Sequence, residues 1–485
     1  MIRRCNFDVV NGMKRFLLLL CLICCLDGIA QTSNFSLSQC IENAYTNHFQ
    51  IKLLEQGNTI TIEQLEQLKA AAQPSLAFNA SQNMNTGRSL DPYTYQFTTN
   101  TIFSNNLSLN ASVTLFSGFK YARSKEQTSL LVEANKENVF KIKNDLALSI
   151  ANQYLQVLLY KEQLIAIDSQ ISRTQQQLIR EEKLFRAGKS NENKIMQIKA
   201  QSLSEEIRKI DLQSAKKNAL IGLKYASAIK SDEFDISIPE ISSVLKDIHD
   251  YTIESVYTEA EKNMASIKYA KANELYYNKG IDVSKSGYYP TLTMSGSLGS
   301  GYSSARKQNT LVSNLSYQPI GYLYSAPSEL VYGPVITNSV TQSNYSFFNQ
   351  IGDNFSQFVG LNLRIPILTN RSNKTSFNIA KINYERAKTE TENTLFNLKK
   401  DIETAVSVYA VTQVKLNKHK EIVDMQEFIL KNLTQYYEAG NITLFELLNQ
   451  KNTIIQSSSS FIQTKYELVF RKLVLDYYAG KPLSL

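Results

Sequence analysis

Apolar residues recur along most of the chain at the spacing of one helix face. Clear examples are Ile142, Leu146, Ile150, Tyr154 and Leu158 in the first half, and Leu398, Ile402, Ala405 and Tyr409 in the second. Neither 120–187 nor 371–439 contains a glycine or a proline. At 1.5 Å per residue, about 65 helical residues form a rod of roughly 100 Å. The pattern therefore predicts long helices of the coiled-coil kind.

Four shorter segments alternate between apolar and polar residues, which is the period of a β-strand with one apolar face. The apolar positions are Leu76, Phe78 and Ala80; Leu107, Leu109, Ala111, Val113 and Leu115; Leu292, Met294 and Leu298; and Val359, Leu361, Leu363, Ile365 and Ile367. Each segment runs to about ten residues, the length of a tilted membrane-spanning strand. We expect two β-hairpins, at about 74–118 and 290–368, in a chain that is mainly α with a small β part.

The chain contains one unit written twice. AAQPSLAFNAS around Pro74 matches SGYYPTLTMSG around Pro290. Gly118 and Gly188 are 70 residues apart, as are Asn370 and Gly440. A spacing preserved over this length indicates a duplication. Repeat 1 covers about 36–230 and repeat 2 about 250–480.

Each repeat predicts the same order of elements. A first helix, over 36–72 or 252–286, ends before a proline that cannot continue it. A β-hairpin and two long helices follow. We expect the long helices to reverse direction near residues 188 and 440, because glycine adopts a positive φ at a helix end at low cost.

The N-terminus carries a predicted signal peptide over residues 1–30. A basic start, an apolar stretch and small residues before Gln31 follow the layout of a secretory signal, and Met13 is an alternative start. Its removal would leave Cys40 as the single cysteine, which can form no intramolecular disulfide. The mature unit would cover 31–485.

Composition excludes several function classes. The net charge of +8 over 485 residues forms no concentrated basic patch, so we expect no nucleic-acid partner. The sequence has no P-loop, G-x-S-x-G or H-E-x-x-H motif, and its three histidines lie far apart. We therefore predict no enzyme activity, no catalytic residue, no cofactor and no metal site.

The predicted strands require other copies of the chain. A sheet edge left open in lipid costs several kcal/mol for each unsatisfied backbone group, so a membrane sheet must close into a barrel. Barrels begin at eight strands, and one chain supplies four. Two copies would supply eight and three copies twelve.

The order of these elements, written twice after a signal peptide, resembles the TolC-like outer-membrane efflux family. The motifs are P-S-L at 74–76, V-T-L-F-S-G at 113–118, F-R-A-G at 185–188 and Y-E-A-G-N-I-T-L-F-E-L-L at 437–448. The resemblance implies a trimer whose twelve shared strands form an outer-membrane β-barrel and whose helices form an α-barrel across the periplasm. It also implies a passive duct for efflux or type I secretion, served by a periplasmic adaptor and an inner-membrane pump.

The same resemblance implies the functional residues. The tips that would meet the adaptor correspond to Ala187, Gly188, Lys189, Ala439, Gly440 and Asn441. The carboxylates that ring the periplasmic aperture in the family correspond to Glu446 and Asn449. Asn449 departs from the family's acidic residue, and Ile442 stands where the family has a basic one. The alternatives are a helix reversal without a partner and a carboxylate that is simply solvated.

The insertion at 299–354 is rich in Tyr, Gly, Ser, Pro and Asn, and it joins two predicted barrel strands. We expect it to lie outside the cell as a plain surface loop, with a surface partner or a lid over the barrel as alternatives. A different protein class would also explain the helices: a secreted periplasmic coiled-coil adaptor or structural protein with no pore. The four alternating strands favour the channel over that class.

Overall fold

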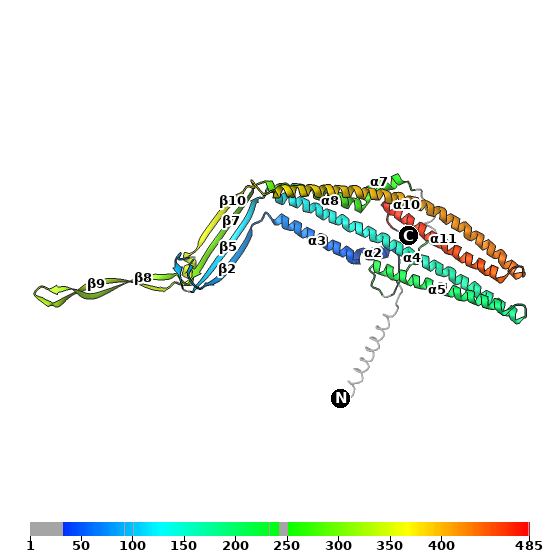
Figure 1. Cartoon of the computed structure of the whole chain (residues 1–485), viewed down its shortest axis with the longest axis horizontal. Helices are drawn as coiled ribbons and strands as arrows, with labels where there is room; N and C mark the ends of the chain where they lie inside the picture. The colour runs from blue at the N-terminus through cyan, green and yellow to red at the C-terminus, as the bar shows by residue number, and fades with distance from the viewer. Residues whose placement is uncertain (1–32, 92, 100, 232, 242–250, 484) are drawn as a thin grey trace, which may run out of the picture. The chain divides into compact units, whose positions relative to one another are not determined.

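A computed structural model of the chain describes residues 33–91, 93–99, 101–231, 233–241, 251–483 and 485. The predicted signal peptide lies outside these residues. The chain divides into two compact units. Among the described residues, the helical unit comprises those up to Thr61, Leu130–Leu275 and Glu385–Leu485, and the strand unit comprises Ile62–Ser129 and Tyr276–Tyr384. The predicted fold class, mainly helical with a smaller β part, is confirmed (Figure 1).

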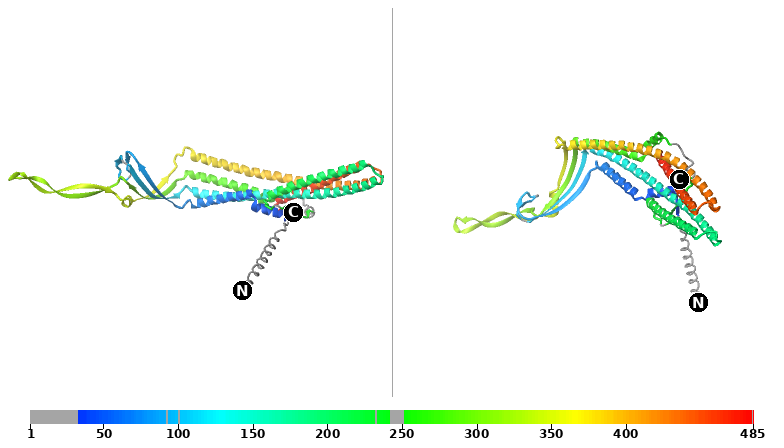
Figure 2. Two further views of the ribbon diagram at one scale, coloured as in Figure 1. Left: turned by 90° about the horizontal axis from the view of Figure 1, so that it is seen from below. Right: turned by 45° about the vertical axis from the view of Figure 1, so that its right-hand side comes forward.

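The helical unit is built on two helical hairpins. α4 (Lys120–Arg186) and α5 (Glu192–Ala226) lie side by side, as do α10 (Ser372–Glu438) and α11 (Leu444–Tyr478) (Figures 1 and 2). α4 and α10 begin and end within one residue of 120–187 and 371–439, the two stretches without glycine or proline.

A core at the centre of the helical unit joins α4, α5 and α11. Ile150, Tyr154 and Leu158 of α4 are at most 1% exposed and pack with Leu223 of α5 and Val469 of α11. The three α4 residues belong to the apolar series that the sequence presented at helical spacing. Two short strands, β1 (Ser33–Phe35) and β6 (Phe234–Ile236), pair in parallel at the edge of this core.

The first helix of each repeat was predicted as one element and is in fact two. α2 (Leu37–Asn47) stops at His48, and α3 (Phe49–Ala70) follows. α7 (Ile253–Asn263) likewise stops at Met264, and α8 (Ala265–Lys285) follows. His48 and Met264 both have extended backbones, with ψ of 129° and 124°.

The two breaks occupy matching positions in the proposed repeats, and packing explains them. Ala44 of α2 and Ala260 of α7 are fully buried, each in a hydrophobic cluster of its own. A change of direction after each short helix therefore lets its apolar side face that cluster. His48 also caps the next helix, because its Nδ1 accepts a hydrogen bond from the Gln50 N–H at 3.3 Å. Neither break contains glycine or proline, so no local signal predicted it.

The strand unit contains a four-stranded antiparallel sheet in the order β10, β7, β5, β2. β2 (Ser75–Asn85) and β5 (Ile102–Phe116) form one hairpin, β7 (Thr291–Ser303) pairs with β10 (Ser356–Arg364), and β5 pairs with β7. The two hairpins thus join through β5 and β7.

The sheet has one apolar and one polar face. Leu109 pairs with Phe78 on one side and with Leu298 on the other, so these apolar residues share a face. The next residue, Asn110, pairs with Ser297 on the opposite face. The alternation inferred from the sequence therefore lies in register across neighbouring strands.

One strand is shorter than its apolar pattern predicted. β10 ends at Arg364, so Ile365 and Ile367 lie beyond it. Pro366 explains the difference, because proline has no N–H to donate to the ladder and restricts the residue before it.

The insertion at 299–354 is not a plain loop. β8 (Lys307–Leu323) and β9 (Ala326–Asn344) pair as a long antiparallel hairpin, and the short helix α9 (Phe347–Asp353) leads back to β10 (Figure 1). A smaller pair, β3 (Ser89–Leu90) with β4 (Phe97–Thr98), lies between β2 and β5.

One helix end in the helical unit carries a strained residue. After α11, Gly480 has a φ of +75°. The N–H groups of Gly480 and Lys481 close the helix end by donating hydrogen bonds to the carbonyl oxygens of Tyr477 and Asp476. The matching residue after α5 is Ala228, with a φ of +52°. An L-residue in this left-handed conformation costs roughly 1–2 kcal/mol.

Replacing Ala228 with glycine is therefore expected to raise the free energy of unfolding by about 1 kcal/mol, after the greater freedom of glycine in the unfolded chain is subtracted. The urea midpoint of the detergent-solubilised protein measures the change. Gly480→Ala is the matched control, and we expect it to lower stability by a similar amount. A lower midpoint for Ala228→Gly would contradict the assignment of strain to this residue.

Candidate functional site

The tip of the first helical hairpin is a glycine-terminated helix end. Gly188 has a φ of +71°. Its N–H donates to the Phe185 carbonyl oxygen at 2.9 Å, and the Lys189 N–H donates to the Leu184 carbonyl oxygen at 2.8 Å. This pair of hydrogen bonds defines a Schellman motif, which satisfies carbonyl groups that the helix end would leave unpaired.

The second tip repeats the same motif. Gly440 has a φ of +79°, its N–H donates to the Tyr437 carbonyl oxygen at 3.0 Å, and the Asn441 N–H donates to Tyr436 at 2.9 Å. A helix cap follows at each tip. Asn191 accepts a hydrogen bond from the Lys194 N–H at 3.0 Å, and Thr443 accepts one from the Glu446 N–H at 3.3 Å.

The six predicted docking residues are exposed, and three of them lie at each tip. They are Ala187, Gly188 and Lys189 at the first tip and Ala439, Gly440 and Asn441 at the second. A Cβ added at Gly188 or Gly440 would meet no atom within 4 Å. The left-handed backbone therefore explains these two glycines within the chain, and the exposed surface around them is free to contact another protein.

Polar contacts tie the two tips to each other. Arg180 of α4 forms an ion pair with Glu438 of α10. Glu181, only 3% exposed, accepts hydrogen bonds from the Ser190 hydroxyl and, at 3.2 Å, from the Tyr437 hydroxyl. Burial, together with the nearby Glu181 carboxylate, raises the pKa of Tyr437 to about 12. The phenol therefore stays protonated and donates at neutral pH.

A groove of about 1030 Å³ lies between the two helical hairpins, close to these contacts. Lys189 and Lys194 line it from the first tip and Gly440 from the second. The Lys194 ammonium also lies 5.6 Å from the centre of the Tyr437 ring, within the range of a cation–π contact.

A buried polar layer connects the hairpins further from the tips. Glu205 of α5 is 3% exposed, and its Oε1 accepts hydrogen bonds from Gln170, Thr174 and Gln201 at 2.9–3.3 Å. Lys451 of α11 is 8% exposed and donates to Gln177 of α4.

Burial in this layer destabilises the charged form of Lys451. Burial lowers the pKa of Lys451, and the carboxylate of Glu205 partly opposes that shift. The Glu205 carboxylate therefore supports the charge of Lys451 from the other hairpin.

The predicted aperture residues lie on the first turns of α11. Glu446 and Asn449 are three residues apart, so they share one side of the helix, and both are exposed. Among the described residues, the Glu446 carboxylate forms no ion pair. Its prediction as an aperture residue stays untested within a single chain.

Sequence reasoning missed the residues that connect the two helical hairpins. Tyr437 lies inside the Y-E-A-G motif, which predicted Ala439 and Gly440 as docking residues but assigned no role to the tyrosine. Lys451 follows Leu444 and Leu447 and precedes Ile454 on the buried side of α11. A lysine in an apolar series is a usable signal. Glu181 gave no such signal, because its burial depends on a helix far away in the sequence.

Two absences can be stated for the described residues. No group of three or more His, Cys, Asp or Glu side chains among them could hold a metal ion. Across the same ranges, no helix is both long enough and apolar enough to span a membrane.

The chain shares sequence with a known family and its fold with solved structures. Residues 256–480 match the model of a family described as outer membrane efflux protein. No match was found among curated proteins. The similar structures include CusC, at 14% identity and a TM-score of 0.71, where the alignment covers 93% of each chain.

Two outer membrane proteins from named organisms have the same fold. The outer membrane channel CmeC of Campylobacter jejuni is 15% identical with a TM-score of 0.69, over 92% of this chain and 85% of that one. The outer membrane protein VceC of Vibrio cholerae is 15% identical with a TM-score of 0.68, over 92% of this chain and 96% of that one. The resemblance predicted from the repeats is therefore confirmed: the chain has the TolC-like channel fold, and its residues 256–480 carry the sequence of the outer membrane efflux protein family.

Proposed function

We propose that the chain is one subunit of a homotrimeric outer-membrane channel. The observation that carries the proposal is the four-stranded sheet. Among the described residues, its edge strands β2 and β10 have no partner on their outer sides, and one face is apolar while the other carries Ser, Asn and Thr. A sheet with these faces suits lipid on one side and water on the other, but its open edges must pair with other copies.

The number of copies follows from the size of the barrel. Eight strands, from two copies, enclose an interior that side chains fill, whereas larger barrels leave an open lumen. Three copies supply twelve strands, which agrees with the trimer that the family resemblance implies. The Ser- and Asn-rich face would then line a water-filled passage.

By the family resemblance, the helical unit would lie in the periplasm. In the proposed assembly, Ala187, Gly188, Lys189, Ala439, Gly440 and Asn441 dock a periplasmic adaptor protein, and Glu446 with Asn449 lines the aperture. The channel itself is passive, and an inner-membrane transporter supplies the energy for efflux or type I secretion. The exposed, well-capped tips support docking, because residues 187–189 and 439–441 present an exposed surface to other proteins.

A secreted coiled-coil protein without a pore is the competing function. It would need the long helices but would have no use for a sheet whose apolar face lies in register over several strands. An exposed apolar face of that size is a liability in water. The sheet therefore favours the channel.

The native mass of the detergent-extracted protein tests the proposal directly. The measurement uses a purified outer-membrane fraction, and we expect three times the mass of the processed chain. A monomer found in the soluble periplasmic fraction would exclude the channel and leave the coiled-coil function.

Ion selectivity tests the aperture. Three Glu446 carboxylates around one opening would attract cations. Glu446→Ala is therefore expected to lower the cation-to-anion permeability ratio in planar bilayers by about two- to tenfold. Asn449→Asp is the matched variant, and it is expected to raise the cation-to-anion permeability ratio because it adds a second acidic ring on the same side of the helix. Unchanged ratios in both variants would remove these residues from the aperture.

A further inference from the structure

Among the described residues, the β8–β9 hairpin has one face whose large apolar side chains are exposed. Leu311 pairs with Val340, and Leu315 pairs with Ile336. Paired residues of antiparallel strands point to the same face. The apolar face is defined by Leu311, Leu315, Tyr317, Tyr332, Ile336 and Val340, whose exposed fractions are 57–72%. One polar pair, Ser313 with Asn338, lies on the same face, and its two side chains hydrogen-bond to each other.

The opposite face of this hairpin is polar and uncharged over most of its length. Gln308 pairs with Ser343, Thr310 with Thr341, and Asn314 with Thr337. Over 307–344, the charged residues are Lys307 and Glu329 alone. The hairpin therefore has one face suited to water and one suited to a dry contact, with almost no charge to repel a second copy.

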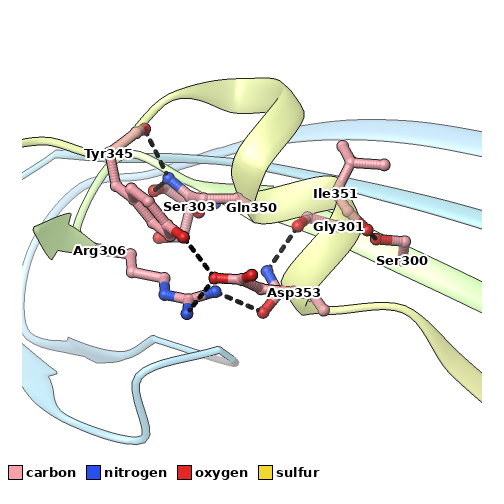
Figure 3. Close-up of polar contacts among 9 residues, drawn as sticks. Ser300, Gly301, Ser303, Arg306, Tyr345, Gln350, Ile351 and Asp353 are labelled. Carbon is pink, nitrogen blue, oxygen red and sulfur yellow. Dashed lines mark hydrogen bonds and ion pairs between the residues drawn. The ribbon is translucent and has the colours of Figure 1, made fainter.

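The base of the hairpin is fixed to the end of β7 (Figure 3). Asp353 of α9 pairs with Arg306 at 2.9 Å and accepts a hydrogen bond from the Tyr345 hydroxyl at 2.5 Å. The Gln350 side chain bonds both backbone groups of Ser303, accepting from its N–H at 3.0 Å and donating to its carbonyl at 3.1 Å. These contacts fix the base of the hairpin to the end of the sheet.

An isolated two-stranded hairpin is at best marginally stable in water. The strands of β8 and β9 have 17 and 19 residues, well beyond the 9–11 that cross a membrane. They begin where β7 has already completed 13 residues of the sheet. Lipid around the sheet would therefore not reach most of the apolar face, and the face needs protein to cover it.

We propose that the apolar faces of the three β8–β9 hairpins in one trimer pack against one another around the three-fold axis. The inference rests on the proposed trimer, because closing the sheet with identical copies brings all three hairpins to the same mouth of the barrel. The occupant of each apolar face is then the same face of another copy. The polar faces point to water, and the packed hairpins narrow the outer exit.

Cysteine cross-linking in the full-length chain tests this contact. Leu315→Cys lies on the apolar face, and its neighbour Asn314→Cys lies on the polar face of the same strand. We expect oxidation in outer-membrane preparations to give a covalent dimer for Leu315→Cys, since one disulfide can form among three thiols at the axis. Asn314→Cys and the parent chain should give none. Cys40 is fully buried, and burial raises its pKa to about 11, so it stays out of the reaction.

The outcomes separate this inference from the proposed function. A trimeric native mass without cross-linking at Leu315→Cys would overturn the hairpin contact and leave the channel standing, with a separate surface partner for the face. Equal cross-linking at both positions would also overturn it. A monomeric native mass would instead overturn the trimer.

A second variant tests the exit without relying on cysteine geometry. A short glycine turn replaces 308–343, which leaves Arg306, Asp353 and the base contacts in place. We expect the trimer to persist and the single-channel conductance to rise. An unchanged conductance would show that the hairpins do not lie over the exit.

Discussion

Replacing Glu205 with alanine is expected to lower the free energy of unfolding by about 3 kcal/mol, because the buried Lys451 ammonium loses the nearby carboxylate that supports its charge and three polar side chains lose their acceptor. Glu205 is 3% exposed and supports the charge of Lys451, which is 8% exposed. Its loss also removes the acceptor for Gln170, Thr174 and Gln201. Urea unfolding of the detergent-solubilised protein measures the change.

A neighbouring carboxylate gives the matched control. Glu206 follows Glu205 on α5 but is exposed, and we expect Glu206→Ala to stay within about 0.5 kcal/mol of the parent. Adding Lys451→Met to Glu205→Ala should recover part of the loss, because the unpaired ammonium is then absent. A double variant no more stable than Glu205→Ala would show that Lys451 is not the group left uncompensated.

The same pair predicts a dependence on pH. Without Glu205, the pKa of Lys451 falls further below its ordinary value, since the carboxylate is what opposes burial. The unfolded chain then binds more protons than the folded one between that lowered pKa and about 10.4, and stability rises with pH wherever this holds. The deficit of Glu205→Ala is therefore expected to shrink as the pH approaches 10.

The elements that were predictable from sequence are those with a strong period or a local signal. The long helices are recognisable because α4 and α10 contain no breaker, and the tips because Gly188 and Gly440 end those helices. The alternation of β2, β5, β7 and β10 gave their apolar faces. In each case the cause lies within a few residues of its effect.

The elements that sequence reasoning missed have two causes. Some depend on packing against helices far away in the sequence, and others lie in a segment whose loop-like composition hid the alternation of a strand. The break at His48 follows from the burial of Ala44 by other helices. In the insertion, Tyr, Ser and Pro indicated a loop, yet Leu311 and Leu315 already stood at strand spacing. Their partners Ile336 and Val340 become visible only once a hairpin register is assumed.

The candidate site divides in the same way. The tip residues could be placed, because a helix end is a local feature. The hydrogen bond from Tyr437 to Glu181 could not, because 256 residues separate the two side chains. Glu446 and Asn449 follow from the family resemblance, and their role depends on copies of the chain that one sequence does not describe.

Tyr154→Ala is expected to lower the free energy of unfolding by about 3–5 kcal/mol, the usual loss for a large aromatic side chain removed from a core. Tyr154 is 1% exposed and lies in the cluster where α4, α5 and α11 meet. Its hydroxyl donates to the Ser237 carbonyl oxygen at 2.7 Å, directly after β6. The ring fills the core, and the hydroxyl connects the β1–β6 pair to α4.

Tyr154→Phe separates these two contributions. It keeps the ring and removes the hydroxyl, so we expect a loss of about 1 kcal/mol, the net contribution of one hydrogen bond to a partly buried carbonyl. Tyr225→Ala is the control on α5, because that side chain is 75% exposed and should change stability by about 0.5 kcal/mol or less. Equal losses for Tyr154→Phe and Tyr154→Ala would assign the whole effect to the hydrogen bond. A loss for Tyr154→Ala no larger than that for Tyr225→Ala would remove Tyr154 from the core that holds the helical hairpins together.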